Sequence, residues 1–282
     1  MTRAELAQSA LRGAIAMRKQ AEVPTNCPVS PVDLATTLGL CVRFVDISME
    51  GMYVSGNQPS IILSSLRPFA RRNFTCGHEL GHHHFGHGST IDELNESAGK
   101  SQFQPEEFLV DAFSGFLLMP PIGMRQAFAD RNISLARAGA YDILRVASAF
   151  GVGYDTLISQ LSATKQLQPD HADRLRRVGL AGIRKELLGV ETAQAIVVVD
   201  QQFEAKTLDL EVGMLVLLPS DVDVSGGLER IRAIGDRNLF EATSPGIGRL
   251  CSASRQWSVF ARVARDRYVG LATYRHLEES DE

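Results

Sequence analysis

Residues 75–82 decide the fold, and they read Thr75-Cys76-Gly77-His78-Glu79-Leu80-Gly81-His82. On a helix of about 3.6 residues per turn, His78 and His82 share one face and can hold one metal ion. Glu79 lies beside the same point. Zinc in a hydrolytic site takes three protein ligands and one water, whose proton a nearby carboxylate can accept. The motif is short and also occurs by chance, so this interpretation requires a third ligand.

A candidate third ligand lies 25 residues further on, in Pro105-Glu106-Glu107-Phe108-Leu109-Val110-Asp111-Ala112-Phe113. Proline followed by two glutamates is typical of a helix start. Glu107 and Asp111 are four residues apart and share a face, so Asp111 can accept a hydrogen bond from a ligand imidazole and fix its tautomer. Glu106 has Val110 at the corresponding place. We therefore predict His78, His82 and Glu107 as metal ligands, Glu79 as general base and Asp111 as the supporting acid.

Other side chains compete for parts of this site. Residues 88–104 are polar and predict a mobile loop, in which Glu93 and Glu96 are alternative ligands without an acid four residues later. Three further histidines are expected at the surface or rim, and any one of them could stabilise an oxyanion: His83, His84 and His87. Tyr53 and Tyr141 are equal rivals for that oxyanion role, and the sequence does not choose among them.

The two motifs together resemble those of the ImmA/IrrE family of metallopeptidases. The resemblance rests on Phe74-Thr75-Cys76-Gly77-His78-Glu79-Leu80-Gly81-His82 and on Glu107-x-x-x-Asp111-x-Phe113-x-x-x-Leu117-Leu118-Met119-Pro120. It covers roughly residues 25–165 and implies a glutamate-liganded zinc peptidase that relieves repression by cleaving a helix-turn-helix repressor. Two departures stand out: Cys76-Gly77 replaces a small aliphatic pair, and Ser114 replaces an alanine. Neither is at a proposed ligand.

Composition excludes several classes of protein. The chain has 282 residues, 44% apolar and 22% charged, with a net charge of −4 and a pI near 6.0, so it has no global attraction to nucleic acid. Four scattered cysteines and a charged N-terminus without a secretory leader predict reduced thiols in the cytoplasm. No run approaches the roughly 18 apolar residues of a membrane span.

The fold class predicted is α+β, and residues 1–125 are expected to form a mainly helical zinc-peptidase domain with a small antiparallel sheet. Helices are predicted at 2–20, 31–38 and 106–119, and a further helix with Pro68 in its first turn carries His78 and His82. Strands are predicted at 41–45, 51–54 and 60–63. Gly56-Asn57-Gln58-Pro59 has turn chemistry that joins the last two strands as a hairpin. We expect the strand at Ile61–Leu63 to lie at a sheet edge, where an extended substrate could pair with it.

Residues 126–188 are predicted to be a helical, helix-turn-helix-like segment. Its second helix offers Tyr154, Asp155, Thr156, Ser159 and Gln160, with no lysine or arginine, so direct DNA binding is disfavoured. Residues 189–282 change to short β-branched and aromatic runs, among them 195–199, 214–219, 238–242, 257–263 and 268–274. They predict a compact antiparallel β-rich domain for sensing or interaction. No pattern assigns an oligomeric state.

These observations lead to a ranked set of functions. The first is a cytoplasmic zinc endopeptidase, with manganese or iron as other metals that suit two imidazoles and one carboxylate. By resemblance, its substrate is a helix-turn-helix repressor encoded nearby, cleaved in a stress response or in mobile-element control. The alternative is a regulatory protein that captures a repressor without cleaving it. A direct DNA-binding regulator ranks third.

Overall fold

The computed structural model describes residues 1–92, 103–203, 205, 207–252 and 257–277. The chain forms two compact units, each described by itself: residues 1–123 with 267–274, and residues 124–266 with 275–282. The α+β fold class is confirmed, with a helical N-terminal part and strands concentrated towards the C-terminus. The division into three domains at 125/126 and 188/189 stays a prediction.

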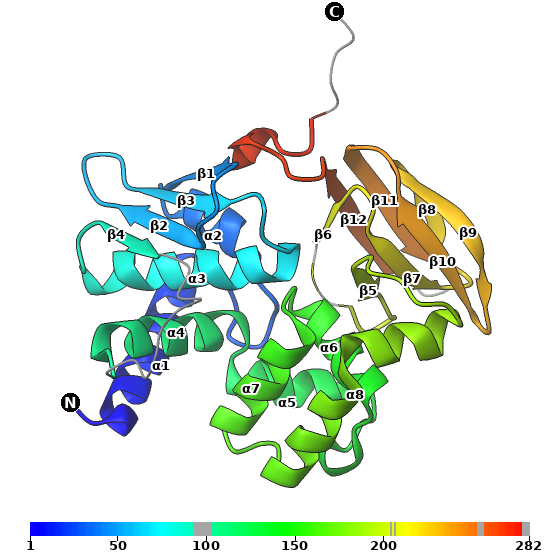
Figure 1. Cartoon of the computed structure of the whole chain (residues 1–282), viewed down its shortest axis with the longest axis horizontal. Coiled ribbons are helices and arrows are strands. Elements are labelled where there is room, and N and C mark those ends of the chain that lie inside the picture. Colours follow the sequence, from blue (N-terminus) through cyan, green and yellow to red (C-terminus); the bar gives the residue numbers. More distant parts are fainter. Residues whose placement is uncertain (93–102, 204, 206, 253–256, 278–282) are drawn as a thin grey trace, which may run out of the picture. The chain divides into compact units, whose positions relative to one another are not determined.

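The first unit is built on four helices that match the predicted ranges: α1 (Arg3–Gln20), α2 (Pro31–Thr37), α3 (Phe69–Phe85) and α4 (Pro105–Leu118). Thr2 and Glu5 form a capping box at the start of α1. Helix α3 packs against the sheet and also against α4, and α4 packs in turn against α1. The two helices that carry the sequence motifs are therefore neighbours (Figure 1).

The sheet of the first unit has the strand order β13-β1-β3-β2-β4. The strands are β1 (Cys41–Val45), β2 (Gly51–Val54), β3 (Ser60–Ser64), β4 (Thr90–Asp92) and β13 (Gly270–Leu271). The predicted hairpin of β2 and β3 is confirmed. The prediction that Ile61–Leu63 lies at a sheet edge is wrong, because β3 pairs with β2 on one side and runs parallel to β1 on the other. Its backbone is therefore already occupied.

A buried arginine fastens α4 to α1. The Arg18 side chain is 1% exposed, and its guanidinium donates to the backbone carbonyls of Leu117, Pro24 and Cys27. Leu117 lies in the last turn of α4, where helix carbonyls lack partners and a positive charge is favoured. Burial lowers the pKa of Arg18 to about 10. This contact anchors the helix that carries Glu107 and Asp111.

The second unit begins with helices. They are α5 (Pro121–Asp130), whose first residues belong to the first unit, η1 (Leu135–Arg137), α6 (Ala140–Ala149), α7 (Tyr154–Ala163) and α8 (Pro169–Leu188). The predicted helix, glycine-containing turn and second helix are present as α6 and α7. Tyr154 and Gln160 of α7 are buried, whereas Asp155 and Ser159 are exposed. The exposed face of α7 thus lacks the cations that bind phosphates.

Two four-stranded sheets complete the second unit, with the orders β5-β7-β10-β9 and β6-β12-β11-β8. Their strands are β5 (Ile196–Val198), β6 (Thr207–Glu211), β7 (Leu215–Pro219), β8 (Asp223–Ser225), β9 (Leu228–Ile234), β10 (Arg237–Ala242), β11 (Gly246–Ser252) and β12 (Trp257–Ala264). Most neighbours are antiparallel, but β5 pairs with β7 and β6 pairs with β12 in parallel. The sheets are therefore antiparallel-rich and not wholly antiparallel.

The prediction that residues 268–274 form a strand of the C-terminal domain is wrong. Only Gly270 and Leu271 are extended, and they pair with β1 of the first unit before the short helix η3 (Ala272–Tyr274). Ala272 is buried in the core of the first unit, and the Tyr268 ring meets the Phe44 ring edge-on at 6.3 Å. These apolar contacts draw the segment away from the sheets that precede it in the chain.

One described stretch, Pro105–Asp130, is long and apolar enough to cross a membrane by length and composition, with a mean hydropathy of 1.2. It comprises α4 and α5 with a break between them, and 61% of its most apolar window is buried inside the protein. A buried core helix can have the same length and composition as a membrane span, and the burial of this stretch is typical of a core helix.

Candidate metal centre

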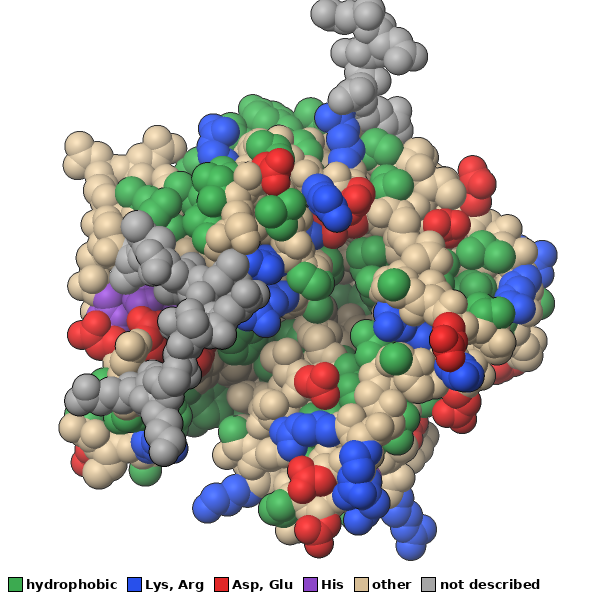
Figure 2. All heavy atoms as spheres, in the orientation of Figure 1, with side chains coloured by type: hydrophobic (Ala, Val, Ile, Leu, Met, Phe, Trp, Pro, Cys, Tyr) green, Lys and Arg blue, Asp and Glu red, His purple; other side chains and the backbone are tan. Residues whose placement is uncertain are grey.

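The two predicted motifs converge where α3 crosses α4. His78 and His82 point from α3 towards Glu107 in the first turn of α4, and one ligand atom from each lies within 4.8 Å of the others. The two Nε2 atoms are 3.1 Å apart. His78 Nε2 lies 3.4 Å from Glu107 Oε2, and His82 Nε2 lies 3.8 Å from Glu107 Oε1. Figure 2 shows histidine side chains beside acidic ones at the left of the visible face.

The chemistry of these three side chains fits a bound cation. His78 is 6% exposed and His82 1%, so both imidazoles are shielded from water. Each imidazole turns its Nδ1 to another side chain. The two Nε2 atoms then face each other at 3.1 Å, and the Glu107 carboxylate lies 3.4–3.8 Å from them. Atoms so placed converge on one point, where a cation could accept a lone pair from each. Tetrahedral zinc, with bonds of about 2.0–2.1 Å, separates its ligand atoms by about 3.3 Å, which matches this spacing.

Each histidine is supported from behind by a different kind of partner. His78 Nδ1 lies 2.8 Å from Asp111 Oδ1, so the carboxylate can accept a hydrogen bond from Nδ1–H, which fixes the tautomer whose Nε2 can bind a metal. His82 Nδ1 lies 3.1 Å from His87 Nδ1. One imidazole is therefore oriented by an acid, and the other by a third imidazole.

His87 reaches His82 because α3 ends in a tight reversal. Gly86 adopts a left-handed conformation with φ of 70°, and the His87 amide donates to the His82 carbonyl at 3.2 Å. The chain thereby folds back and lays residue 87 against the helix face that carries His82. Sequence reasoning placed His87 at the surface or rim. The signal that could have found it is the glycine after the last apolar residue of the helix.

Glu79 lies on the side of α3 that faces the sheet. It is fully buried, and a side-chain Cβ on Gly51 of β2 would come within 2.6 Å of Glu79 Oε1. A strand can approach this carboxyl group only because residue 51 has no side chain. The carboxyl group of Glu79 is thus confined by the sheet, on the residue next to His78 in the chain.

The comparison with protein families bears on this geometry. Residues 36–162 match the family model Peptidase_M78, the IrrE N-terminal-like domain. Residues 36–162 are therefore similar to an M78 peptidase domain. The match contains α3 and α4 and ends within α7. It supports an ImmA/IrrE family metallopeptidase, as the motifs predicted. No curated protein matches the chain in a sequence comparison.

The two departures of this M78 domain from the family pattern contact each other. A Cβ added to Gly77 would lie 2.5 Å from Ser114 Oγ, and Ser114 Oγ donates to the Phe74 carbonyl at 2.7 Å. One turn further along α3, a Cβ on Gly81 would lie 2.9 Å from Val110 Cβ. The missing side chain at 77 therefore leaves room for the extra hydroxyl at 114, and this close approach of α3 and α4 sets the position of Glu107.

We expect Gly77→Ala to destabilise the M78 domain by about 1–3 kcal/mol, the usual range for overpacking a core. Ser114→Ala alone should cost about 1 kcal/mol through the lost hydrogen bond to Phe74. The double variant should be less destabilised than the sum of the two, because the remaining Cβ distance is 3.4 Å. Urea unfolding of all four proteins measures this coupling, and additive losses would show that the two residues do not interact.

The support of His82 by His87 can be tested with a matched pair of variants. His87→Leu removes the side-chain hydrogen-bonding group at similar volume, whereas His87→Asn keeps one on a smaller side chain. We expect the leucine variant to bind zinc about 10–100-fold more weakly and the asparagine variant to stay near the parent protein. Competition with a fluorescent chelator measures the affinities. Equal affinities for leucine and asparagine would contradict a role for the hydrogen bond.

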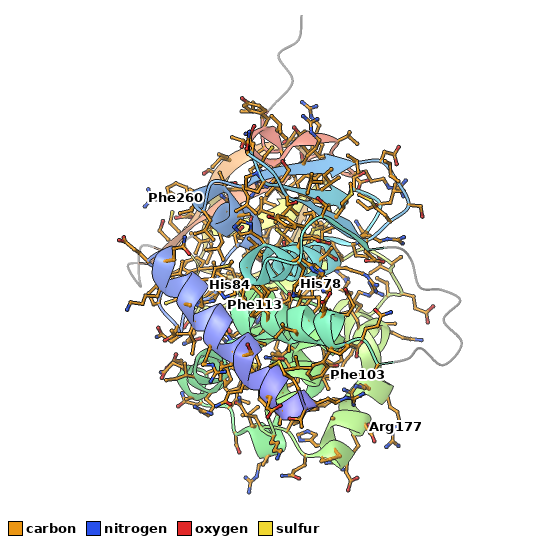
Figure 3. All side chains as sticks on the ribbon, turned by 90° about the vertical axis from the view of Figure 1, so that its left-hand side faces the viewer. His78, His84, Phe103, Phe113, Arg177 and Phe260 are labelled. Carbon is orange, nitrogen blue, oxygen red and sulfur yellow. The ribbon has the colours of Figure 1, made fainter. Side chains whose placement is uncertain are left out.

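The remaining sequence candidates fall in different places. The Tyr53 hydroxyl of β2 lies 2.9 Å from Nδ1 of His83 in α3, so these two candidates form a hydrogen-bonded pair. The His84 ring stacks on the Phe113 ring, with 5.4 Å between the ring centres, and Figure 3 labels both residues beside each other. Glu106 is exposed and is not among the converging side chains. Tyr141 lies in the second unit, and Glu93 and Glu96 lie outside the described residues.

Proposed function

We propose that this protein is a zinc-dependent endopeptidase. The observation that carries the proposal is the convergence of two buried imidazoles and the Glu107 carboxylate, with the buried Glu79 next to His78 in the chain. The M78 family supports a metallopeptidase in general, while zinc and cleavage within a chain are the finer parts of the proposal. Two imidazoles and one carboxylate are also the ligand set of known catalytic zinc sites.

The roles proposed for the residues follow from their positions. His78, His82 and Glu107 hold the metal, which when bound polarises the scissile carbonyl and makes water more acidic. Glu79 takes a proton from the attacking water and passes it to the leaving amine. Asp111 and His87 hold the two imidazoles with Nε2 directed inward, as their distances of 2.8 Å and 3.1 Å allow.

The proposed substrate is a helix-turn-helix transcriptional repressor encoded nearby, cleaved in the cytoplasm so that a stress or mobile-element programme is expressed. This part of the proposal is supported by the resemblance to the ImmA/IrrE family. Helix α7 adds a negative argument, because it contributes no lysine or arginine of its own to contact DNA phosphates.

Incubation with candidate repressors tests the proposal. The purified protein, loaded with zinc or manganese, is mixed with each repressor, and the products are resolved by mass spectrometry. Discrete fragments that disappear with a chelator and with Glu79→Gln are the expected result. A stoichiometric complex without fragments would favour the non-cleaving binding protein, and salt-sensitive retention of operator DNA by this protein alone would favour a DNA-binding regulator.

A further inference from the structure

The second unit contains a polar pocket of about 430 Å³ that the peptidase proposal does not use. Its wall is formed by Arg145 from the middle of α6, the segment after β5 and the turns that flank β7 and β10. The volume is in the range of small-molecule sites. The charged and hydroxyl side chains that line it are Arg145, Asp200, Ser220, Asp221, Asp236 and Arg237.

A buried carboxylate fixes one side of this pocket. Asp200 accepts two hydrogen bonds of 2.8 Å from Arg131, which is itself buried, and bonds of 2.9–3.0 Å from Arg145. The Gln202 amide adds a further bond at 3.1 Å. Asp200 is therefore saturated, and its single negative charge is shared between two guanidinium groups. Arg145 Nη1 lies 3.7 Å from Asp142 Oδ1, which is too long for a hydrogen bond.

Arg237 supplies the second cation of the pocket. Its side chain is 18% exposed. Within the described part of the chain its contacts are long: 3.4 Å to the Val199 carbonyl and 4.0 Å to the solvent-exposed carboxylate of Asp236. The guanidinium carbons of Arg145 and Arg237 each lie 5.8 Å from the centre of the Tyr141 ring. Both guanidinium groups are thus held in place with donor groups still available.

The charges of the pocket define what it can bind. Two guanidinium groups, Arg145 and Arg237, line the pocket, while Arg131 contacts the Asp200 carboxylate from outside the lining. These four groups together carry about two positive charges before the exposed acids are counted. Asp221 and Asp236 stand at the exposed rim and would repel a polyanion. We propose that this pocket binds a small molecule through one compact anionic head group, a carboxylate or a phosphate, held between Arg145 and Arg237. Planar donors in a fixed fork suit either group.

Calorimetric titration of the full-length protein tests this proposal independently of any peptidase activity. The probes are inorganic phosphate, succinate and tripolyphosphate. Phosphate and succinate distinguish the two head groups, and we expect one of them to bind and tripolyphosphate to bind more weakly. Arg237→Gln should weaken that binding by about 10-fold or more, because a charge-assisted hydrogen bond is lost. Arg230→Gln, an exposed arginine of the neighbouring strand β9, should leave it unchanged.

Binding by neither phosphate nor succinate at millimolar concentration would overturn the proposal. So would equal weakening by Arg237→Gln and Arg230→Gln, which would indicate general attraction of anions. Melting curves show whether Arg237→Gln is folded. If it is not, Arg237→Lys carries the test, since it keeps the charge but loses the planar fork and should show the same loss of affinity.

Discussion

Replacing Glu79 with glutamine is expected to reduce hydrolysis of a cleaved repressor by about 10²–10⁴-fold, the usual contribution of a general base. Glutamine has nearly the same shape but cannot accept a proton from water. Because Glu79 is not among the converging ligand atoms, the metal should stay bound at one equivalent. Single-turnover cleavage rates, measured beside zinc content in the same samples, check both halves of this expectation.

The matched control for Glu79→Gln is Glu106→Gln, which removes an exposed carboxylate from the start of α4. It should cleave at the parent rate. A Glu79→Gln protein that retains zinc and cleaves normally would contradict the role of general base. A protein that loses zinc would show instead that Glu79 belongs to the metal ligands.

Replacing Glu107 with glutamine is expected to give the second large effect, on metal affinity. Glu107 supplies the only charged oxygens among the three converging side chains. Its loss should therefore weaken zinc binding by more than the roughly 10–100-fold typical of an outer partner such as Asp111. Glu106→Gln again serves as the control, because the two glutamates are adjacent and only Glu107 faces the histidines.

Chelator competition on the Glu106 and Glu107 variants gives the result directly. If both variants bind zinc as the parent does, the third ligand is another residue. If Glu106→Gln binds zinc more weakly than Glu107→Gln, α4 is rotated about its axis so that Glu106, and not Glu107, faces the histidines. Cleavage activity should follow metal affinity for both variants at limiting zinc.

Much of the first unit could be predicted from local sequence signals. Helix ends follow from Thr2 with Glu5, from Pro105 and from the glycine after α3. The i,i+4 spacings predicted which side chains share a helix face, and the structure brings His78, His82 and Glu107 together with Asp111 behind. These signals suffice because each depends on a few neighbouring residues.

The features that sequence reasoning missed depend on distant contacts. The central position of β3 requires a parallel pairing with β1, and no local pattern specifies that partner. Residues 270–271 join β1 because Tyr268 and Ala272 find apolar surface in the first unit. His87 lies beyond the end of α3, so helical spacing does not relate it to His82; only the left-handed turn at Gly86 does.

The central claim is that His78, His82 and Glu107 bind one zinc ion. X-ray absorption at the zinc edge, on protein loaded with one equivalent, tests it most directly. We predict a first shell of nitrogen and oxygen atoms only, at about 2.0–2.1 Å, with the multiple scattering of two imidazoles. A sulfur at about 2.3 Å, for which Cys76 on α3 is the nearest source in sequence, or a shell with no imidazole, would contradict the account.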